Sequence, residues 1–126
     1  MEFPGDLRYT KDHEWVRFDN GSATVGITEF AQDELGEIVF VDLPDVGKKL
    51  EKGETICVVE STKAASDVYS PLGGTVEETN PALSDSPEQV NSSPYDEGWM
   101  VKLSGVAEDE FTGLMSADEY KGLVNA

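Results

Sequence analysis

The chain has 126 residues, 38% of them hydrophobic, and its 26 acidic and 9 basic residues give a formal net charge of −17 at pH 7. We expect residues 1–126 to form a single domain, because this length supports one core with little to spare. The acidic residues are spread along the chain, which excludes nucleic acid and anionic membranes as partners, since both require basic patches.

The first half of the chain predicts short strands separated by turns, with one helix. The elements expected, in order, are a hairpin of residues 15–18 and 22–27, a helix between Thr28 and Gly36, a strand over 37–43 and a strand from Thr55. Asp19-Asn20-Gly21 suits a hairpin turn. Thr28 can cap the helix and Gly36 can end it.

The second half continues this pattern and ends in helices. We expect a strand over 75–78, a polar loop over 84–97, a strand over 98–103, and helices over 108–115 and 117–124. Ser116 and Glu119 have the spacing of a capping box. The apolar side chains expected in the core are Val25, Ile27, Ile38, Phe40, Ile56, Val58, Val76 and the neighbours of 99–103.

Lys63 stands between two β-prone arms. Ile56 to Val59 is one apolar run, and Val68-Tyr69 begins another before Pro71. The residues between them are small, so the ammonium group should stand on an exposed hairpin tip. Taken alone, this spacing favours an ordinary surface lysine in a tight turn over a lysine displayed for modification.

The sequence does not predict a catalytic or metal site. His13 is the only histidine and Cys57 the only cysteine, and no nucleophile motif surrounds either residue. One histidine and one cysteine cannot supply the usual zinc ligands, and no calcium-binding loop is present. A single cysteine cannot form an intramolecular disulfide either, which suits a reducing compartment. We therefore expect neither an enzyme nor a metalloprotein.

Several segments together resemble the H-protein family of the glycine cleavage system. The matching segments are His13-Glu14-Trp15-Val16, Val25-Gly26-Ile27-Thr28, residues 35–41, Val59-Glu60-Ser61 through Lys63-Ala64, Ser66-Asp67-Val68, and Asn91-Ser92-Ser93-Pro94-Tyr95 through Gly98-Trp99. The resemblance runs from Leu7 to the C-terminal helix.

This resemblance implies a mainly β fold of the lipoyl/biotinyl type. Such a fold is a flattened β-barrel sandwich with the lysine on a hairpin tip and short appended helices, including a C-terminal helical segment at about 107–125. It also implies that Lys63 carries covalently attached lipoate through an amide bond, which removes the positive charge of the lysine. The cofactor would supply the chemistry and the protein would display it.

The resemblance further implies a shuttle role among partner enzymes. A glycine decarboxylase would load an aminomethyl group onto the lipoyl sulfur, an aminomethyltransferase would remove it, and a dihydrolipoamide dehydrogenase would reoxidise the dithiol. A lipoate-attaching enzyme would modify the protein, which we expect to be a monomer. The bacterial cytoplasm is the expected compartment, since no targeting segment opens the chain, and the mitochondrial matrix is the alternative.

Two acidic residues are candidates for a site that protects the loaded arm. An aminomethyl group on sulfur is labile in water and cationic at neutral pH, so a water-poor cleft containing a carboxylate would stabilise it. Asp67 lies four residues after Lys63, and Glu14 belongs to a segment that the resemblance places at the cleft. Both residues fit ordinary surface acids equally well.

Other carrier roles share this pattern. A biotinyl carrier domain has the same fold, but its lysine sits between methionines, whereas Thr62 and Ala64 flank Lys63. A lipoyl domain of a 2-oxo-acid dehydrogenase is shorter and is followed by a flexible linker. Two further alternatives are an H-like protein that only relays lipoate to other enzymes and an interaction domain without a cofactor.

Overall fold

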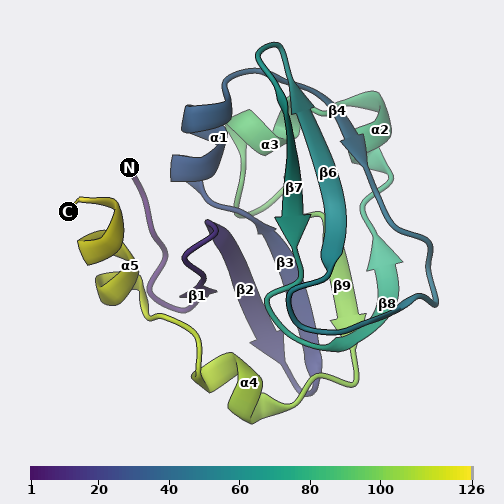
Figure 1. The fold of residues 1–126 in the computed structure, drawn as a ribbon, viewed down its shortest axis with the longest axis vertical. Coiled ribbons are helices and arrows are strands. Elements are labelled where there is room, and N and C mark those ends of the chain that lie inside the picture. The colour runs from purple at the N-terminus through teal and green to yellow at the C-terminus, as the bar shows by residue number, and fades with distance from the viewer. Residues whose placement is uncertain (126) are drawn as a thin grey trace.

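The computed structural model describes residues 1–125, which form two antiparallel sheets with short helices around them (Figure 1). The larger sheet has the strand order β1-β2-β3-β9-β8-β5, and the smaller has the order β4-β6-β7. The strands are β1 (Arg8–Tyr9), β2 (Glu14–Asp19), β3 (Ser22–Ile27), β4 (Ile38–Asp42), β5 (Lys49–Leu50), β6 (Thr55–Ser61), β7 (Ala65–Tyr69), β8 (Gly74–Thr79) and β9 (Val101–Ser104). The helices are α1 (Glu29–Leu35), α2 (Ala82–Asp85), α3 (Gln89–Ser92), α4 (Glu108–Thr112) and α5 (Ala117–Val124).

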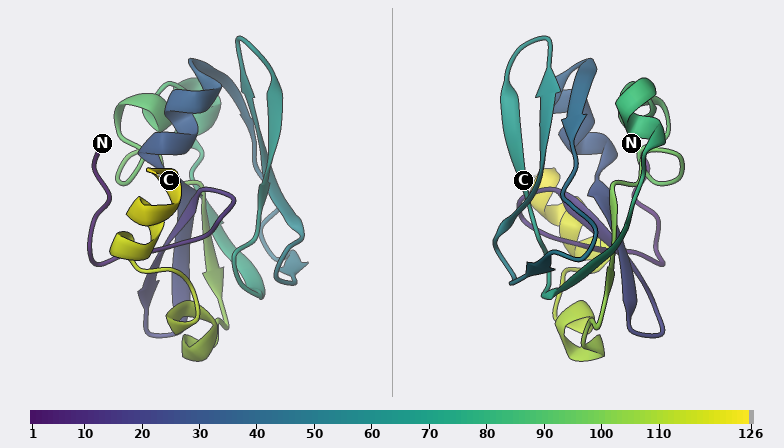
Figure 2. Two further views of the ribbon diagram at one scale, coloured as in Figure 1. Left: turned by 60° about the vertical axis from the view of Figure 1, so that its left-hand side comes forward. Right: turned by 90° about the vertical axis from the view of Figure 1, so that its right-hand side faces the viewer.

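The two sheets pack against each other through one apolar core (Figure 2). Val25 and Leu103 of the larger sheet share this core with Ile38, Ile56 and Val59 of the smaller one. No strand pairing among residues 1–125 joins the two sheets, so they form a flattened sandwich rather than a closed barrel. The expected mainly β fold with short helices is confirmed.

The β2–β3 hairpin forms where the sequence predicts it. Asn20 and Gly21 have φ angles of 48° and 82°, as a two-residue hairpin turn requires. Trp15 faces Gly26 across the hairpin, and a Cβ atom on Gly26 would lie 2.7 Å from the indole ring. Gly26 therefore leaves the space in which Trp15 is fully buried, with its Nε1 donating to the carbonyl oxygen of Pro94 at 2.9 Å.

The helices agree with the sequence where a local signal specifies them. Thr28 caps α1, the N–H of Gly36 closes its last turn, and Ser116 and Glu119 form the expected capping box of α5. The predicted loop over 84–97 is wrong in part, because it contains the end of α2 and all of α3. These two helices have four residues each and are held by the burial of Leu83 and Val90 rather than by helix propensity. The helix predicted over 108–115 is shorter, since α4 ends at Thr112.

Phe40 is a correction to the predicted core. A β-bulge between Ile38 and Phe40 breaks the alternation of β4, and Val39 and Phe40 are 50% and 49% exposed. Val58 is only partly buried. The other named strand residues, Val25, Ile27, Ile38, Ile56 and Val76, lie in the core as predicted.

The helices of this fold are short. Among the described residues, none is both long and apolar enough to span a bilayer.

Candidate functional site

Lys63 lies at the tip of the β6–β7 hairpin, which projects beyond the rest of the molecule (Figures 1 and 2). The second arm of the hairpin begins at Ala65, earlier than the predicted start at Val68, so only Thr62, Lys63 and Ala64 form the connection. All three residues are exposed. The hairpin therefore presents a single amino group at its end.

Ser61 holds the turn that carries Lys63. Its Oγ accepts hydrogen bonds from the backbone N–H groups of Lys63 and Ala64, each at 3.1 Å, and donates to the carbonyl oxygen of Ala64 at 3.1 Å. Serine hydroxyls are suited to such local backbone bonds. The backbone at Lys63 is thus fixed while its side chain remains accessible.

The hairpin tip also contacts the segment that joins α1 to β4. The N–H of Thr62 donates to the carbonyl oxygen of Glu37 at 3.1 Å. Gly36 has a φ angle of 83°, and a Cβ atom there would lie 3.3 Å from Cε of Lys63. Gly36 therefore serves two purposes: it adopts a left-handed conformation that ends α1, and it leaves room for the lysine stem.

Asn91 also holds this segment. Its Nδ2 donates to the carbonyl oxygen of Gly36 at 2.9 Å and to Oε1 of Gln32 at 2.8 Å, while its Oδ1 accepts from the N–H of Ile38 at 2.8 Å. One side chain from α3 thus connects the end of α1 to the start of β4, below the hairpin tip.

A cleft of about 140 Å³ lies between α1 and β7, next to the hairpin; we call it the α1–β7 cleft. Its lining includes Asp12, His13, Glu14, Ala31, Glu34, Leu35, Ser66 and Asp67. The two sequence candidates Glu14 and Asp67 therefore border the same cleft. Asp67 is four residues from Lys63, on the strand that follows the turn.

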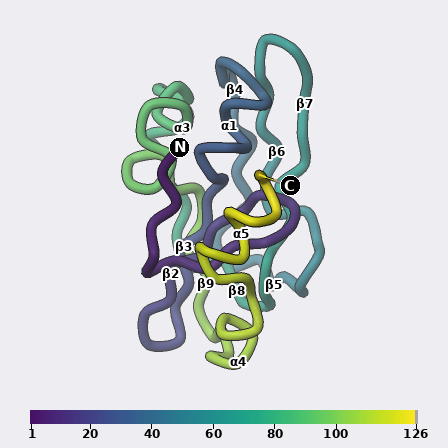
Figure 3. The backbone as a smooth tube through the Cα atoms, turned by 90° about the vertical axis from the view of Figure 1, so that its left-hand side faces the viewer, coloured from purple at the N-terminus to yellow at the C-terminus, as the bar shows by residue number. Residues whose placement is uncertain are grey.

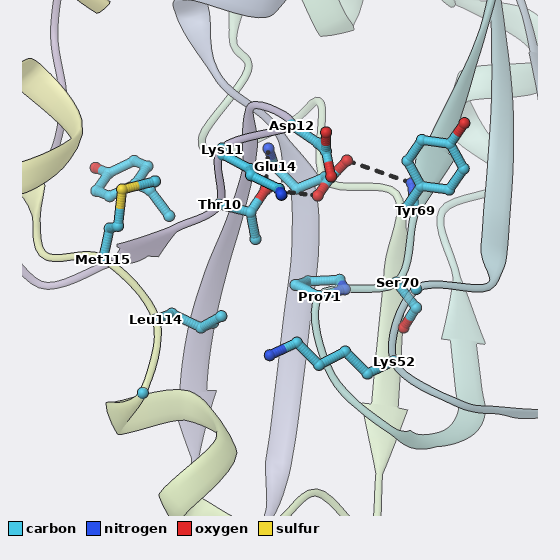
Figure 4. Close-up of a pocket in the computed structure, with 13 residues that line it drawn as sticks. Thr10, Lys11, Asp12, Glu14, Lys52, Tyr69, Ser70, Pro71, Leu114 and Met115 are labelled. Atoms are coloured by element: carbon cyan, nitrogen blue, oxygen red, sulfur yellow. Dashed lines mark hydrogen bonds between the residues drawn. The ribbon is translucent and has the colours of Figure 1, made fainter. Parts of the chain in front are cut away.

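Glu14 and Asp67 differ in their surroundings. Asp67 is exposed, whereas Glu14 is only 2% exposed. The carboxylate of Glu14 accepts from Oγ1 of Thr10 at 2.6 Å and from the N–H of Tyr69 at 3.3 Å (Figure 4). Burial raises the pKa of Glu14 to about 7, although these two hydrogen bonds oppose the rise. Its charge is thus sensitive to pH near neutrality.

Glu14 also borders a larger cavity of about 320 Å³ on its other side (Figure 4). Leu114 and Met115 form part of its apolar wall, and Lys11 and Lys52 are exposed at its rim. Glu14 is therefore the one carboxylate named here that is both buried and shared between two cavities.

His13 belongs to a second polar group at the α1–β7 cleft. Its Nδ1 lies 2.8 Å from the hydroxyl of Tyr120 on α5, and the same hydroxyl lies 2.8 Å from Oγ1 of Thr28, the cap of α1. Burial lowers the pKa of His13, against the opposing effect of the Asp12 and Glu34 carboxylates. Residues 1–125 contain no group of histidine, cysteine or acidic side chains placed to hold a metal ion.

The sequence predicts Lys63, Glu14 and Asp67 as site residues and Gly36 as the end of a helix, but it gives no role at the hairpin tip to Ser61, Gly36 or Asn91. The Ser-x-Lys spacing and the glycine at the end of a predicted helix were signals for the first two. No local signal reveals Asn91, because its partners lie 53 to 59 residues away in the chain.

Comparison with known proteins agrees with this arrangement. The family described as glycine cleavage H-protein matches residues 7–126. The glycine cleavage system H protein of Listeria welshimeri is 53% identical over 124 residues, covering 98% of this chain and 99% of that protein. Its counterpart from an Anaeromyxobacter strain is 50% identical over 124 residues, with coverages of 98% and 97%.

A solved structure is similar over nearly the whole chain. The crystal structure of a glycine cleavage system H protein from Mycobacterium marinum superposes with a TM-score of 0.87 at 39% identity, covering 98% of this chain and 100% of that one. Sequence and fold therefore agree, and the chain belongs to the glycine cleavage H-protein family.

Proposed function

We propose that this protein is the lipoyl carrier of a glycine cleavage system, and that Lys63 is the residue to which lipoate is attached. The single observation that carries the proposal is the exposed Lys63 at the end of a projecting hairpin, with its backbone fixed by Ser61. Membership of the H-protein family supports it. The rigid backbone and the free amino group meet what an attaching enzyme requires of an acceptor lysine.

In this role the protein is a carrier and not a catalyst. Lipoate supplies a dithiolane that can be opened, loaded with an aminomethyl group and closed again by oxidation. A glycine decarboxylase loads the arm, an aminomethyltransferase unloads it, and a dihydrolipoamide dehydrogenase reoxidises it. The chain itself contributes the display of Lys63 and the surface that each enzyme meets. The bacterial origin of the named relatives supports a bacterial cytoplasmic setting.

We further propose that the α1–β7 cleft receives the loaded arm. A lysine side chain lengthened by the lipoyl group has the reach to extend from Lys63 past Asp67 toward Glu14. The cationic amine would lie between the exposed Asp67 and the buried Glu14, where a carboxylate in a water-poor site favours the charged amine. Exclusion of water would slow hydrolysis of the aminomethyl group.

The decisive experiment compares Lys63→Arg with Lys52→Arg, because both substitutions keep the positive charge. After exposure to the lipoate-attaching enzyme, mass spectrometry should find lipoate on wild type and Lys52→Arg but none on Lys63→Arg. Reconstitution with the three partner enzymes and glycine should give activity with wild type and with Lys52→Arg, but not with Lys63→Arg.

Two outcomes would contradict the proposal. Lipoate found on Lys48, Lys49 or Lys52 would show that another lysine is the attachment site. A lipoylated protein that supports transfer of lipoate to other enzymes, but no glycine cleavage, would assign the chain to a relay role instead.

A further inference from the structure

Tyr120 connects the C-terminal helix to the α1–β7 cleft through two hydrogen bonds. Figure 3 shows α5 just below α1 on one side of the molecule. The fully buried Tyr120 places its hydroxyl 2.8 Å from Nδ1 of His13 and 2.8 Å from Oγ1 of Thr28. His13, from the loop before β2, lines the cleft directly, and Thr28 caps α1, which forms one of its walls. One hydroxyl therefore touches two elements of the cleft.

The direction of these hydrogen bonds follows from counting protons. Oγ1 of Thr28 already accepts from the N–H of Ala31, so its single hydrogen is free to be donated. If Thr28 donates to Tyr120, the Tyr120 hydroxyl donates to Nδ1 of His13, and every group is satisfied. The reverse direction leaves the buried hydroxyl hydrogen of Thr28 without an acceptor, which is unfavourable.

Once Nδ1 accepts, a neutral His13 must carry its proton on Nε2. That nitrogen makes no hydrogen bond within residues 1–125, yet no buried side-chain nitrogen or oxygen in this part of the chain lacks a partner. Nε2 is therefore open to solvent, on a ring that lines the cleft. Phe30, whose ring centroid lies 4.8 Å from that of His13, restricts the imidazole further.

We propose that Tyr120 is a positioning residue that holds His13 in the neutral form with the proton on Nε2, so that the cleft offers the arm a hydrogen-bond donor without adding a positive charge. This inference rests on the proposed seat of the arm in the α1–β7 cleft. Tyr120 itself, on the far side of His13, acts on the arm only through that ring.

The charges around His13 make its neutral state important. The acidic residues that line the cleft with it are Asp12 from the preceding loop, Glu14 from β2, Glu34 from α1 and Asp67 from β7. A cationic arm is attracted to these carboxylates, and an imidazolium among them would offset that attraction. Protonation of Nδ1 would also reverse the hydrogen-bond chain and leave the hydroxyl of Thr28 unpaired.

Nitrogen NMR of the imidazole ring tests the inference on unmodified protein. His13 is the only histidine, so its signals need no assignment. Wild type should show a neutral ring protonated on Nε2 near neutral pH. Tyr120→Phe keeps the aromatic ring stacked on Tyr9 but removes the donor, so it should give a mixture of tautomers and a His13 that protonates at higher pH beside Asp12 and Glu34.

Tyr9→Phe is the matched control. Its ring centroid lies 4.8 Å from that of Tyr120, and its hydroxyl bonds to the carbonyl oxygen of Pro4. The variant thus removes a hydroxyl from the same aromatic cluster without touching His13, and its imidazole spectrum should match wild type. An Nδ1-protonated ring in wild type overturns the inference whether or not Tyr120→Phe folds, and so does an unchanged spectrum in Tyr120→Phe.

The consequence for the arm is measured separately on the lipoylated, loaded protein. Tyr120→Phe should shorten the lifetime of the aminomethyl group by about two- to tenfold, the factor that one net hydrogen bond provides. The effect should grow as the pH falls into the range in which His13 of the variant gains its proton. An unchanged lifetime at every pH would overturn this consequence, whereas failure of the wild-type protein to become lipoylated or loaded would count against the proposed function and leave the NMR result standing.

Discussion

At the scale of single residues, Glu14 gives the proposed protective cleft a pH dependence. Its pKa is raised to about 7 by burial, so the free cleft loses its buried charge as the pH falls through that value. A cationic amine beside the carboxylate favours the charged form and lowers the pKa again. Loading the arm should therefore release a proton, and retention should be strongest above pH 7 and weaken as the pH falls.

The lifetime of the loaded protein without the transferase measures this effect. Glu14→Gln and Asp67→Asn should each release formaldehyde and ammonia faster than wild type. In Glu14→Gln the release rate should also lose the pH dependence that Glu14 gives wild type between about pH 6 and about pH 8. The protective role would be lost if both variants matched wild type across this range. The carrier role of Lys63 would be unaffected by that result.

Substitutions of Ile56 and Phe40 test which of these two apolar side chains belongs to the core. Ile56 is 3% exposed and Phe40 is 49% exposed. Ile56→Ala should lower the free energy of unfolding by about 2–5 kcal/mol, because it leaves a cavity. Phe40→Ala should lower it by less than about 1 kcal/mol, because its side chain is already half in water. Urea denaturation distinguishes the two, and equal losses would contradict the bulge in β4.

At the scale of elements, one hydroxyl supports the turn at the tip of the β6–β7 hairpin. Ser61→Ala removes the acceptor used by the N–H groups of Lys63 and Ala64 and the donor to the Ala64 carbonyl. These groups are exposed, so water replaces the lost bonds and stability should change by less than about 1 kcal/mol. The turn should become mobile, and the rate of lipoate attachment to Lys63 should fall while the melting temperature hardly changes.

Ser61→Thr is the control, because it keeps the hydroxyl. It should retain most of the attachment rate, with amide hydrogen exchange at Lys63 and Ala64 close to wild type. Equal attachment rates for Ser61→Ala and wild type would show that the turn needs no such support.

The elements that sequence predicted well are those specified by neighbours in the chain. Asn20-Gly21 determines a hairpin turn, Thr28 and Gly36 delimit α1, and Ser116 with Glu119 caps α5. The exposure of Lys63 followed in the same way from the small residues around it. In each case the deciding contacts lie within a few residues.

The elements that sequence missed depend on distant partners. The bulge that exposes Phe40 arises from pairing with β6, and α3 is held by burial of Val90 rather than by its own sequence. The contact between His13 and Tyr120 spans 107 residues. The sequence left Glu14 open between a cleft acid and a surface acid, because it does not show that the distant Tyr69 donates to its carboxylate.

At the scale of the whole molecule, the net charge of −17 should act on encounters with partner enzymes. Within residues 1–125 the structure has one ion pair, Lys102 with Glu77 at 3.7 Å, so the acidic surface is largely uncompensated. Such a field attracts basic faces over a screening length of about 8 Å at physiological salt. The KM for this protein should therefore rise with salt in assays of each partner enzyme, while kcat changes little.

Substitution of two carboxylates at opposite ends of the molecule shows which part of the acidic surface acts on partner binding. Glu60 is exposed on β6 and pairs with Ala65 near the hairpin tip, whereas Glu108 is exposed on α4 at the far end (Figure 1). Glu60→Gln should raise the KM and reduce its salt dependence, because partners must approach Lys63. Glu108→Gln removes the same charge and should leave both unchanged. A KM independent of salt in wild type, or equal effects of the two variants, would mean that the acidic surface does not direct docking at the hairpin.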